Sequence, residues 1–127
     1  MRGFFLRNFS GMAMILSNKN KDFFEQVYQV VRLIPSGRIT SYGAIASYLS
    51  VKSAARMVGW AMNASHKHSD IPAHRVVNRI GLLTGRLHFE TESTMQERLE
   101  AEGIKIIENQ VQSFTLIFWD PAIELKL

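Results

Sequence analysis

The chain has 127 residues, 46% of them hydrophobic, which suits one domain with a buried core and is too short for two ordinary domains. Its 15 Lys and Arg against 11 Asp and Glu give a formal charge of +4, and the sequence pI near 9.7 favours a polyanionic partner. The absence of cysteine excludes disulfides, thiolate zinc sites and thiol nucleophiles.

The first 20 residues show no steady hydrophobic period and run into a polar segment, which predicts a flexible N-terminal extension followed by a single domain over residues 21–127. No stretch reaches the roughly 20 apolar residues that a membrane span needs. We therefore expect a cytoplasmic monomer with no membrane partner.

Three helices are predicted in the first half of the domain. The first begins near Asp22 and stops before Pro35 and Gly37. The second follows Thr40 or Ser41, either of which could be its N-cap. The third is predicted over residues 53–63. The expected inward positions of the three helices are Phe23, Phe24, Val27, Val30, Val31 and Ile34; Ile45, Ala46 and Leu49; and Ala54, Val58, Ala61 and Met62.

The second and third predicted helices are joined by a few residues and resemble a helix-turn-helix. The third helix carries small residues, including Ala55 and Gly59, that would let its backbone come close to another surface. That surface could be DNA, or the pattern could reflect ordinary tight helix packing. On its other face the spacing places Ser53, Arg56, Trp60 and Asn63 together.

The second half of the domain is predicted to add a small β component. Residues 79–86 are typical of a turn with extended flanks, as in a wing. A last helix follows Ser93, with Met95 and Leu99 inward, and ends at Gly103. Residues 104–108 and 112–119 are β-prone, forming a small sheet or an apolar flap. The fold class is therefore mainly α with a small β component, and helix-turn-helix-like with a wing.

Three stretches together resemble the DNA-binding domain of the O6-alkylguanine-DNA alkyltransferases. They are residues 34–43 (IPSGRITSYG), 55–62 (ARMVGWAM) and 71–78 (IPAHRVVN), in register over residues 22–108. The active repair proteins have a cysteine where this chain has Ala73. That departure resembles the alkyltransferase-like proteins, a non-enzymatic branch of the family.

The resemblance implies roles for residues on the DNA side. Arg56 corresponds to the finger that enters the duplex through the minor groove and replaces a rotated base. Tyr42 corresponds to the residue that crowds the phosphate. Ser53, Ala55, Gly59 and Trp60 complete the predicted DNA-binding set, although Trp60 could equally pack against the protein.

The resemblance also implies a pocket for the flipped base, formed by Met62, Ser65, Pro72, Ala73, His74 and Arg86. Arg86 is expected to face the guanine through a cation–π contact or a hydrogen bond. Two positions depart from the alkyltransferases. Ser65 stands where they have a pocket asparagine, and the glutamate of their thiol-activating relay aligns near Gln96 or Glu97, which suggests that the relay is not maintained.

Transfer of an alkyl group from guanine O6 needs a soft nucleophile such as a thiolate, and alanine offers none. We therefore predict a damage sensor without a cofactor that binds O6-alkylguanine in double-stranded DNA, flips the base and flags it for nucleotide excision repair proteins. Two alternatives remain: a weak enzyme using His74 or Ser65, and a general helix-turn-helix DNA-binding module without lesion specificity.

Several further residues keep two interpretations. His66, His68, His74 and His88 are more simply surface or structural histidines than zinc ligands, because no cysteine or ordered carboxylate set accompanies them. Arg75 either contacts phosphate or forms an internal ion pair. Phe118 and Trp119 either cover the pocket or pack in the core.

Overall fold

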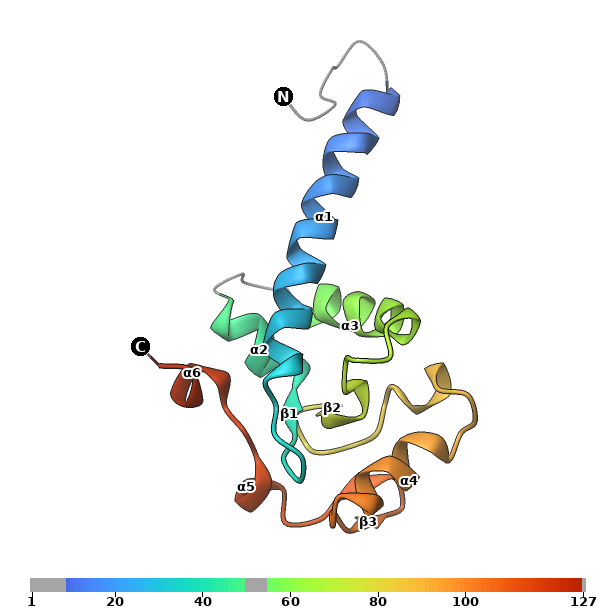
Figure 1. Cartoon of the computed structure of the whole chain (residues 1–127), viewed down its shortest axis with the longest axis vertical. Helices are drawn as coiled ribbons and strands as arrows, with labels where there is room; N and C mark the ends of the chain where they lie inside the picture. The colour runs from blue at the N-terminus through green and yellow to red at the C-terminus, as the bar shows by residue number, and fades with distance from the viewer. Residues whose placement is uncertain (1–8, 50–54, 127) are drawn as a thin grey trace.

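The computed structural model describes residues 9–49 and 55–126. It is mainly helical, with two small two-stranded sheets, as the sequence predicts. In Figure 1 the first turns of the long helix α1 project away from the other helices, and α4 and β3 lie at the opposite end of the view. In this part of the chain no helix is both long and apolar enough to cross a membrane.

Helix α1 (Phe9–Arg32) begins earlier than the predicted start near Asp22. That prediction was wrong because the polar run before Asp22 was interpreted as a break, whereas Asn and Lys are tolerated inside a helix. Its end agrees with the sequence: Gly37 has a φ of +84°, a left-handed conformation that a side chain would strain. Whether the residues before position 21 are flexible stays a prediction.

The predicted helix-turn-helix is formed by α2 (Tyr42–Tyr48) and α3 (Ala55–Ala64), which pack on each other. Of the two candidate N-caps, Ser41 is the one used: its hydroxyl accepts a hydrogen bond from the Ala44 N–H at 3.1 Å. The start predicted for α3 at Ser53, and the inward Ala54, lie outside the described residues.

A short parallel pair connects the two halves of the domain. Strand β1 (Thr40–Ser41) leads directly into α2, and it pairs with β2 (Val76–Val77) in the register Thr40↔Val76 and Ser41↔Val77. All four residues are buried. The start of α2 is therefore held in a fixed position relative to the turn that precedes β2.

The wing-like segment after β2 is closed by Asn78, whose side-chain oxygen accepts hydrogen bonds from the N–H groups of Ile80 and Leu82 at 3.0 and 2.8 Å. Gly81 allows the turn with a φ of +85°. A bridge from Leu82 to Gln110 attaches it to the C-terminal hairpin. Short 3-10 turns, η1 (Ser65–Lys67), η2 (Ala73–Arg75) and η3 (Arg86–His88), shape the connections.

The C-terminal segment is less extended than predicted. Helix α4 (Thr94–Ala101) buries Met95 and Leu99 as expected. The predicted strand at residues 104–108 is confirmed in part, and the one at 112–119 is wrong for most of its length. The chain forms a hairpin and then two short helices: β3 (Ile106–Ile107), β4 (Gln110–Val111), α5 (Phe114–Ile117) and α6 (Pro121–Glu124).

Two buried clusters form the core. One joins α1, α2 and α3, and it includes the predicted positions Val27, Val31 and Val58. The other joins the wing segment, α4 and the hairpin around Leu83 and Leu99. Ala73 packs at the border of both clusters, so its turn is fixed from two sides.

Candidate nucleic-acid interface and base pocket

The outward face of α3 borders a shallow groove of about 460 Å³, here called the α3 groove. Its lining residues are Tyr42, Ala55, Arg56, Gly59, Trp60, Asn63, Thr84, Gly85 and His88. Arg56 is exposed, and 51% of the Trp60 surface is accessible to solvent. The groove thus brings together the residues predicted to bind DNA, except Ser53, which lies outside the described residues.

Tyr42 lies where α2 meets the wing segment. An added Cβ at Gly85 would come within 3.0 Å of the Tyr42 hydroxyl, so the absence of a side chain at Gly85 makes room for the phenol. Burial raises the pKa of Tyr42 above its usual value, and a hydrogen bond with the Thr84 side chain acts more weakly in the opposite direction. The phenol is therefore neutral at physiological pH and offers a hydrogen-bond donor at the groove.

A second, larger hollow of about 800 Å³ surrounds the predicted base pocket and is here called the Ala73 pocket. Ser65, Pro72, Ala73 and His74 all line it, as the resemblance implies. Its other lining residues are Arg32, His66, His68, Ser69, Asp70, Ile71, Arg75, His88, Phe89, Glu90 and Arg98.

Two of the predicted pocket residues lie elsewhere. Met62 is only 4% exposed and packs in the core cluster of α1, α2 and α3. Arg86 is half-buried and donates from Nη1 to the Leu83 carbonyl at 3.2 Å. Neither is a lining residue of the α3 groove or of the Ala73 pocket. Contact of these two side chains with a bound base stays a prediction.

Ala73 opens the η2 turn directly before β2. Its N–H donates to the Ile71 carbonyl at 2.8 Å, and the Arg75 N–H donates to the Pro72 carbonyl at 3.0 Å. Because β2 pairs with β1 in parallel, this turn lies at the N-terminal end of the strand pair, whereas α2 starts at its C-terminal end. Tyr42 and Ala73 are consequently presented by the two ends of one rigid strand pair.

His74 and Arg75 share one carboxylate. Nε2 of His74 lies 2.6 Å from Glu102 Oε2, and Nη2 of Arg75 lies 2.7 Å from the same oxygen. Glu102 Oε1 also accepts from the Gly37 N–H at 2.9 Å, and Arg75 Nη1 donates to the Ile34 carbonyl at 2.8 Å. The internal interpretation of Arg75 is confirmed, and its guanidinium ties the pocket turn to the end of α1.

The glutamate that pairs with His74 was assigned wrongly from the sequence. It is Glu102, at the C-terminal end of α4, and not Gln96 or Glu97, whose side chains bond to Glu100 and Ser93. The expectation that no relay partner remains is therefore overturned. The error arises because the alignment of short motifs fixes α4 only within a turn, whereas the hydrogen bond depends on which residue reaches His74.

The charge state of this cluster follows from its partners. Burial opposes ionisation of Glu102, but the bonds from Arg75, the Gly37 N–H and His74 outweigh it and lower its pKa to about 2. For His74, burial lowers the pKa, with Glu102 acting in the opposite direction. At neutral pH the carboxylate is thus paired with Arg75, and the neutral imidazole donates its Nε2–H to it.

Ser65 is 1% exposed, and its hydroxyl donates to the Met62 carbonyl at 2.6 Å. This bond caps the end of α3 and commits the serine proton to the protein backbone. The buried hydroxyl therefore holds the wall of the Ala73 pocket in place, which is a structural task whatever else it does.

Two further histidines, His66 and His68, contact aromatic rings. His66 meets the Phe89 ring edge-on at 4.5 Å between centroids, and the His68 and Tyr28 rings lie 5.7 Å apart. Within residues 9–49 and 55–126 no three His, Asp or Glu side chains come together as metal ligands would.

Phe118 and Trp119 belong to the core. Trp119 is 3% exposed, and its backbone N–H donates to the Ile39 carbonyl at 2.7 Å. Phe118 packs against Phe114 and forms a bridge with Ile39. Neither residue lines either hollow, so the core interpretation is confirmed and the flap interpretation is wrong.

Sequence reasoning missed several lining residues, namely Asn63, Thr84, His88 and Glu90, together with the His74 partner Glu102. For Asn63 the helical spacing offered a signal, since it shares a face with Arg56 and Trp60. For Thr84, His88, Glu90 and Glu102, no local pattern in the sequence shows which hollow or partner the side chain reaches.

Comparison with known proteins agrees with this geometry. The family model for the 6-O-methylguanine DNA methyltransferase DNA-binding domain matches residues 22–104. Alkyltransferase-like protein 1 of Schizosaccharomyces pombe is 36% identical over 104 residues, which cover 79% of this chain and 96% of the relative. The DNA base-flipping protein of Escherichia coli is 35% identical over 88 residues, covering 69% of this chain and 67% of the relative.

Among solved structures, S. pombe Atl1 in complex with damaged DNA containing O6-carboxymethylguanine superposes with a TM-score of 0.71 at 34% identity. The match covers 80% of this chain and 97% of the Atl1 chain. By its motifs, its fold and these relatives, the chain belongs to the family of the 6-O-methylguanine DNA methyltransferase DNA-binding domain, and within it to the alkyltransferase-like proteins.

Proposed function

We propose that this protein is a non-enzymatic sensor of O6-alkylguanine in duplex DNA. It binds through the minor groove, rotates the modified base into the Ala73 pocket, holds it there unchanged, and flags it for nucleotide excision repair. One observation carries the proposal: the residue at the alkyl-accepting position, Ala73, lies in the wall of an 800 Å³ pocket beside His74, where it offers only a methyl group.

Binding to damaged DNA is supported by the relatives. S. pombe Atl1 has been solved with DNA containing O6-carboxymethylguanine, and the E. coli relative is a DNA base-flipping protein. The groove residues of this chain suit the same task. The exposed Arg56 is free of the core, and Gly59 has no atom within 4 Å of the position where a Cβ would stand, so the groove face of α3 is open.

The binding free energy that these residues can supply is large enough to offset the cost of flipping a base. Extruding a base costs a few kcal/mol, and least for a damaged pair. Arg56 filling the vacated stack, Tyr42 beside the phosphate and apolar contact in the pocket can each contribute on the order of 1–3 kcal/mol. Several such contacts together offset the cost.

The chemistry of the pocket favours holding over transfer. An alkyl carbon bonded to O6 is attacked well by a thiolate, but oxygen and imidazole nitrogen are harder nucleophiles. The Ser65 proton is donated to the Met62 carbonyl, and His74 Nε2 is bonded to Glu102. Both residues that could replace the thiol as nucleophile, Ser65 and His74, are therefore already engaged in hydrogen bonds within the protein.

The proposed link to nucleotide excision repair follows from the absence of any repair reaction in the proposed mechanism. A protein that holds a lesion without removing it is useful only if another pathway does the removal. The bound protein would bend the DNA and hold one base flipped out, and this distortion would mark the site for the repair proteins. A reconstituted incision assay tests this link: adding the protein should increase the incision of an O6-methylguanine duplex and leave an undamaged duplex unchanged.

The fate of the methyl group tests the non-enzymatic claim. Excess protein is incubated with a duplex containing O6-methylguanine, after which the nucleosides and the intact protein mass are both analysed. We expect O6-methylguanine to be recovered in full and the protein mass to be unchanged. A gain of one methyl on Ser65 or His74, with loss of the modified base, would establish a weak enzyme instead.

A further inference from the structure

Two chain segments border both hollows, and each runs from one to the other. The first segment consists of the end of α3 and the η1 turn that follows it. Its residues Trp60 and Asn63 line the α3 groove, and Ser65 and His66, which follow at once, line the Ala73 pocket. This segment therefore forms one continuous wall from groove to pocket.

The second segment forms the facing wall. Thr84 and Gly85 line the α3 groove, whereas Phe89 and Glu90 line the Ala73 pocket. Between them, His88 lines both hollows. Since both walls pass from groove to pocket in the same chain order, the hollows adjoin between them, and His88 stands at the junction.

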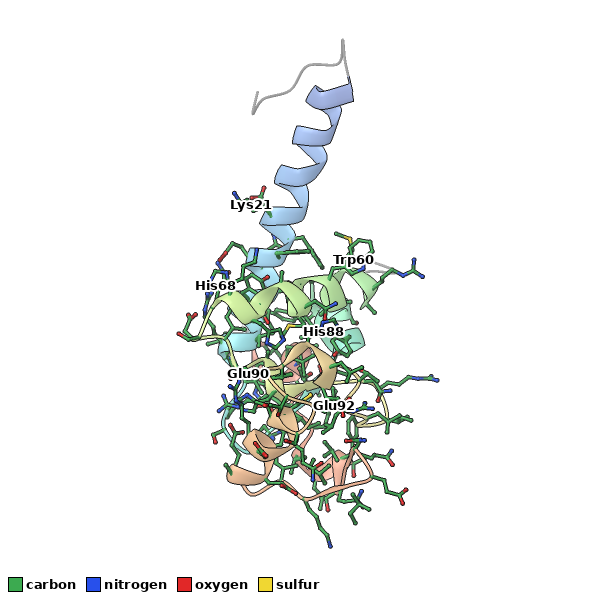
Figure 2. All side chains as sticks on the ribbon, turned by 90° about the vertical axis from the view of Figure 1, so that its right-hand side faces the viewer. Lys21, Trp60, His68, His88, Glu90 and Glu92 are labelled. Atoms are coloured by element: carbon green, nitrogen blue, oxygen red, sulfur yellow. The ribbon has the colours of Figure 1, made fainter. Side chains whose placement is uncertain are left out.

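We propose that His88 is a doorway residue: its imidazole borders the passage through which an extrahelical guanine moves from the α3 groove into the Ala73 pocket, and its size controls that movement. The inference rests on the proposed function, since it concerns the route taken by the flipped base. Figure 2 shows His88 below α3, on the same side of the molecule as Trp60.

The backbone that carries His88 is held on both sides. The His88 N–H donates to the Gly85 carbonyl at 3.1 Å, and the Phe89 N–H donates to the Arg86 carbonyl at 3.2 Å. Phe89 is 9% exposed, and Arg98 lies over its ring at 5.6 Å from the centroid. Because the frame is fixed and the side chain of His88 is exposed, the side chain is the variable part of the doorway.

Across the passage stands His66, whose ring meets Phe89. Burial lowers the pKa of His66, and the charge of His88 is the next contribution in the same direction. The two imidazoles therefore lie within electrostatic reach of each other, as expected of side chains on opposite walls of one opening. Flat rings on both walls suit the passage of a flat purine, which slides between them without needing a wide gap.

A size series at position 88 tests the doorway. His88→Ala removes the ring and His88→Trp enlarges it. The matched controls are His68→Ala and His68→Trp, because His68 is also an exposed histidine and lines the Ala73 pocket without lining the α3 groove. Two readouts are taken: stopped-flow fluorescence of 2-aminopurine placed beside O6-methylguanine, and equilibrium affinity for damaged and undamaged duplexes.

We expect His88→Trp to slow the fluorescence rise and weaken lesion affinity by about tenfold, the size of an ordinary overpacking penalty. Affinity for undamaged duplex should fall by a smaller factor, because undamaged DNA meets the α3 groove without sending a base past position 88, and His88→Ala should flip the base at least as fast as the parent. An unchanged rate in His88→Trp would overturn the assignment, and so would an equal loss in His68→Trp, which would indicate crowding of the pocket as a whole.

Failure of the proposed function would look different. In that case the parent protein itself would bind damaged and undamaged duplexes equally and give no fluorescence rise. If the parent binds damaged duplex more tightly than undamaged duplex and His88→Trp behaves like the parent, the proposed sensor function stands and only the proposed role of His88 is wrong.

Discussion

Nε2 of His74 lies 2.6 Å from Oε2 of Glu102, so the imidazole next to Ala73 has a carboxylate partner. With Nε2 engaged by the carboxylate, Nδ1 is the ring nitrogen that could take a proton from a group at position 73. A histidine–carboxylate pair, which is able to activate a thiol, is thus present beside a residue that has no thiol. This relationship makes the chemistry of the pocket testable by single substitutions.

Ala73→Cys should gain slow methyl transfer, up to one methyl per chain. The His74–Glu102 pair would draw the thiol proton, the sulfur would bond to the methyl carbon, and the carbon–O6 bond would break to leave guanine after protonation. Intact mass and nucleoside analysis measure this.

Two controls accompany Ala73→Cys. Ala73→Ser has a hard nucleophile at the same place and should transfer nothing, and adding Glu102→Gln should suppress the gain. If Ala73→Cys remained unmethylated after long incubation with excess damaged duplex, the pair would not be a competent relay.

Glu102→Gln should destabilise the fold by about 2 kcal/mol at neutral pH, because the Arg75 guanidinium would lose its charged partner. Chemical denaturation measures the effect. Glu92→Gln is the matched control, since Glu92 is an exposed glutamate. Equal stability of the two variants would show that the cluster contributes little.

The lowered pKa of Glu102 predicts that the folded protein loses stability in acid. This pKa is about 2 when folded and near 4.5 otherwise, so the unfolded chain binds a proton at higher pH than the native one. The contribution of Glu102 is therefore present above about pH 4.5 and is lost as pH falls toward 2. Denaturation midpoints between pH 6 and 2.5 should fall less steeply in Glu102→Gln than in the parent, and parallel curves would contradict this.

Gly59→Ala separates folding from DNA contact. The added methyl meets no protein atom within 4 Å, so helix propensity should raise stability by about 1 kcal/mol. The same methyl would project toward the α3 groove and should weaken DNA affinity by about tenfold if α3 approaches the duplex closely.

Gly43→Ala is the control for Gly59→Ala: it also meets nothing within 4 Å, lies in α2, and lines neither hollow. It should gain stability without losing affinity. Undiminished binding by Gly59→Ala would mean that another face of the protein meets the DNA.

Arg56→Ala should weaken binding to O6-methylguanine duplex by about tenfold to a hundredfold, because the proposed role of Arg56 is to fill the vacated stack. Arg79→Ala removes an equal charge from an exposed residue that lines neither hollow. It should weaken damaged and undamaged duplexes by the same small factor. Similar selectivity loss in both variants would show that Arg56 acts only as a charge.

Much of the fold follows from the sequence because local patterns specify it. The spacing of Val27, Val31 and Val58 predicts the buried faces, and Ser41 and Gly37 mark helix ends by their own chemistry. The strand predicted over residues 112–119 fails because β-prone residues also suit a short helix. Ser113, in the left-handed region with a φ of 57°, redirects the chain before it.

Some residues of the candidate site can also be predicted from the sequence, and others cannot. Helical period places Arg56 and Trp60 on one face, and the family resemblance assigns the DNA role of that face and the special position of Ala73. Glu102 and His88 are not found in this way, since their roles depend on which side chain reaches a partner 28 residues away, or on a turn whose path is set by tertiary packing. Such long-range choices leave no local period in the sequence.

The most direct test of the sensor is the ratio of two affinities. Duplexes that differ only in guanine or O6-methylguanine at one position are titrated with the protein at one fixed salt concentration, since phosphate contacts vary steeply with salt. The account predicts binding at least about tenfold tighter to the modified duplex, with the methyl group still on the recovered DNA. Equal affinity for the two duplexes would contradict it.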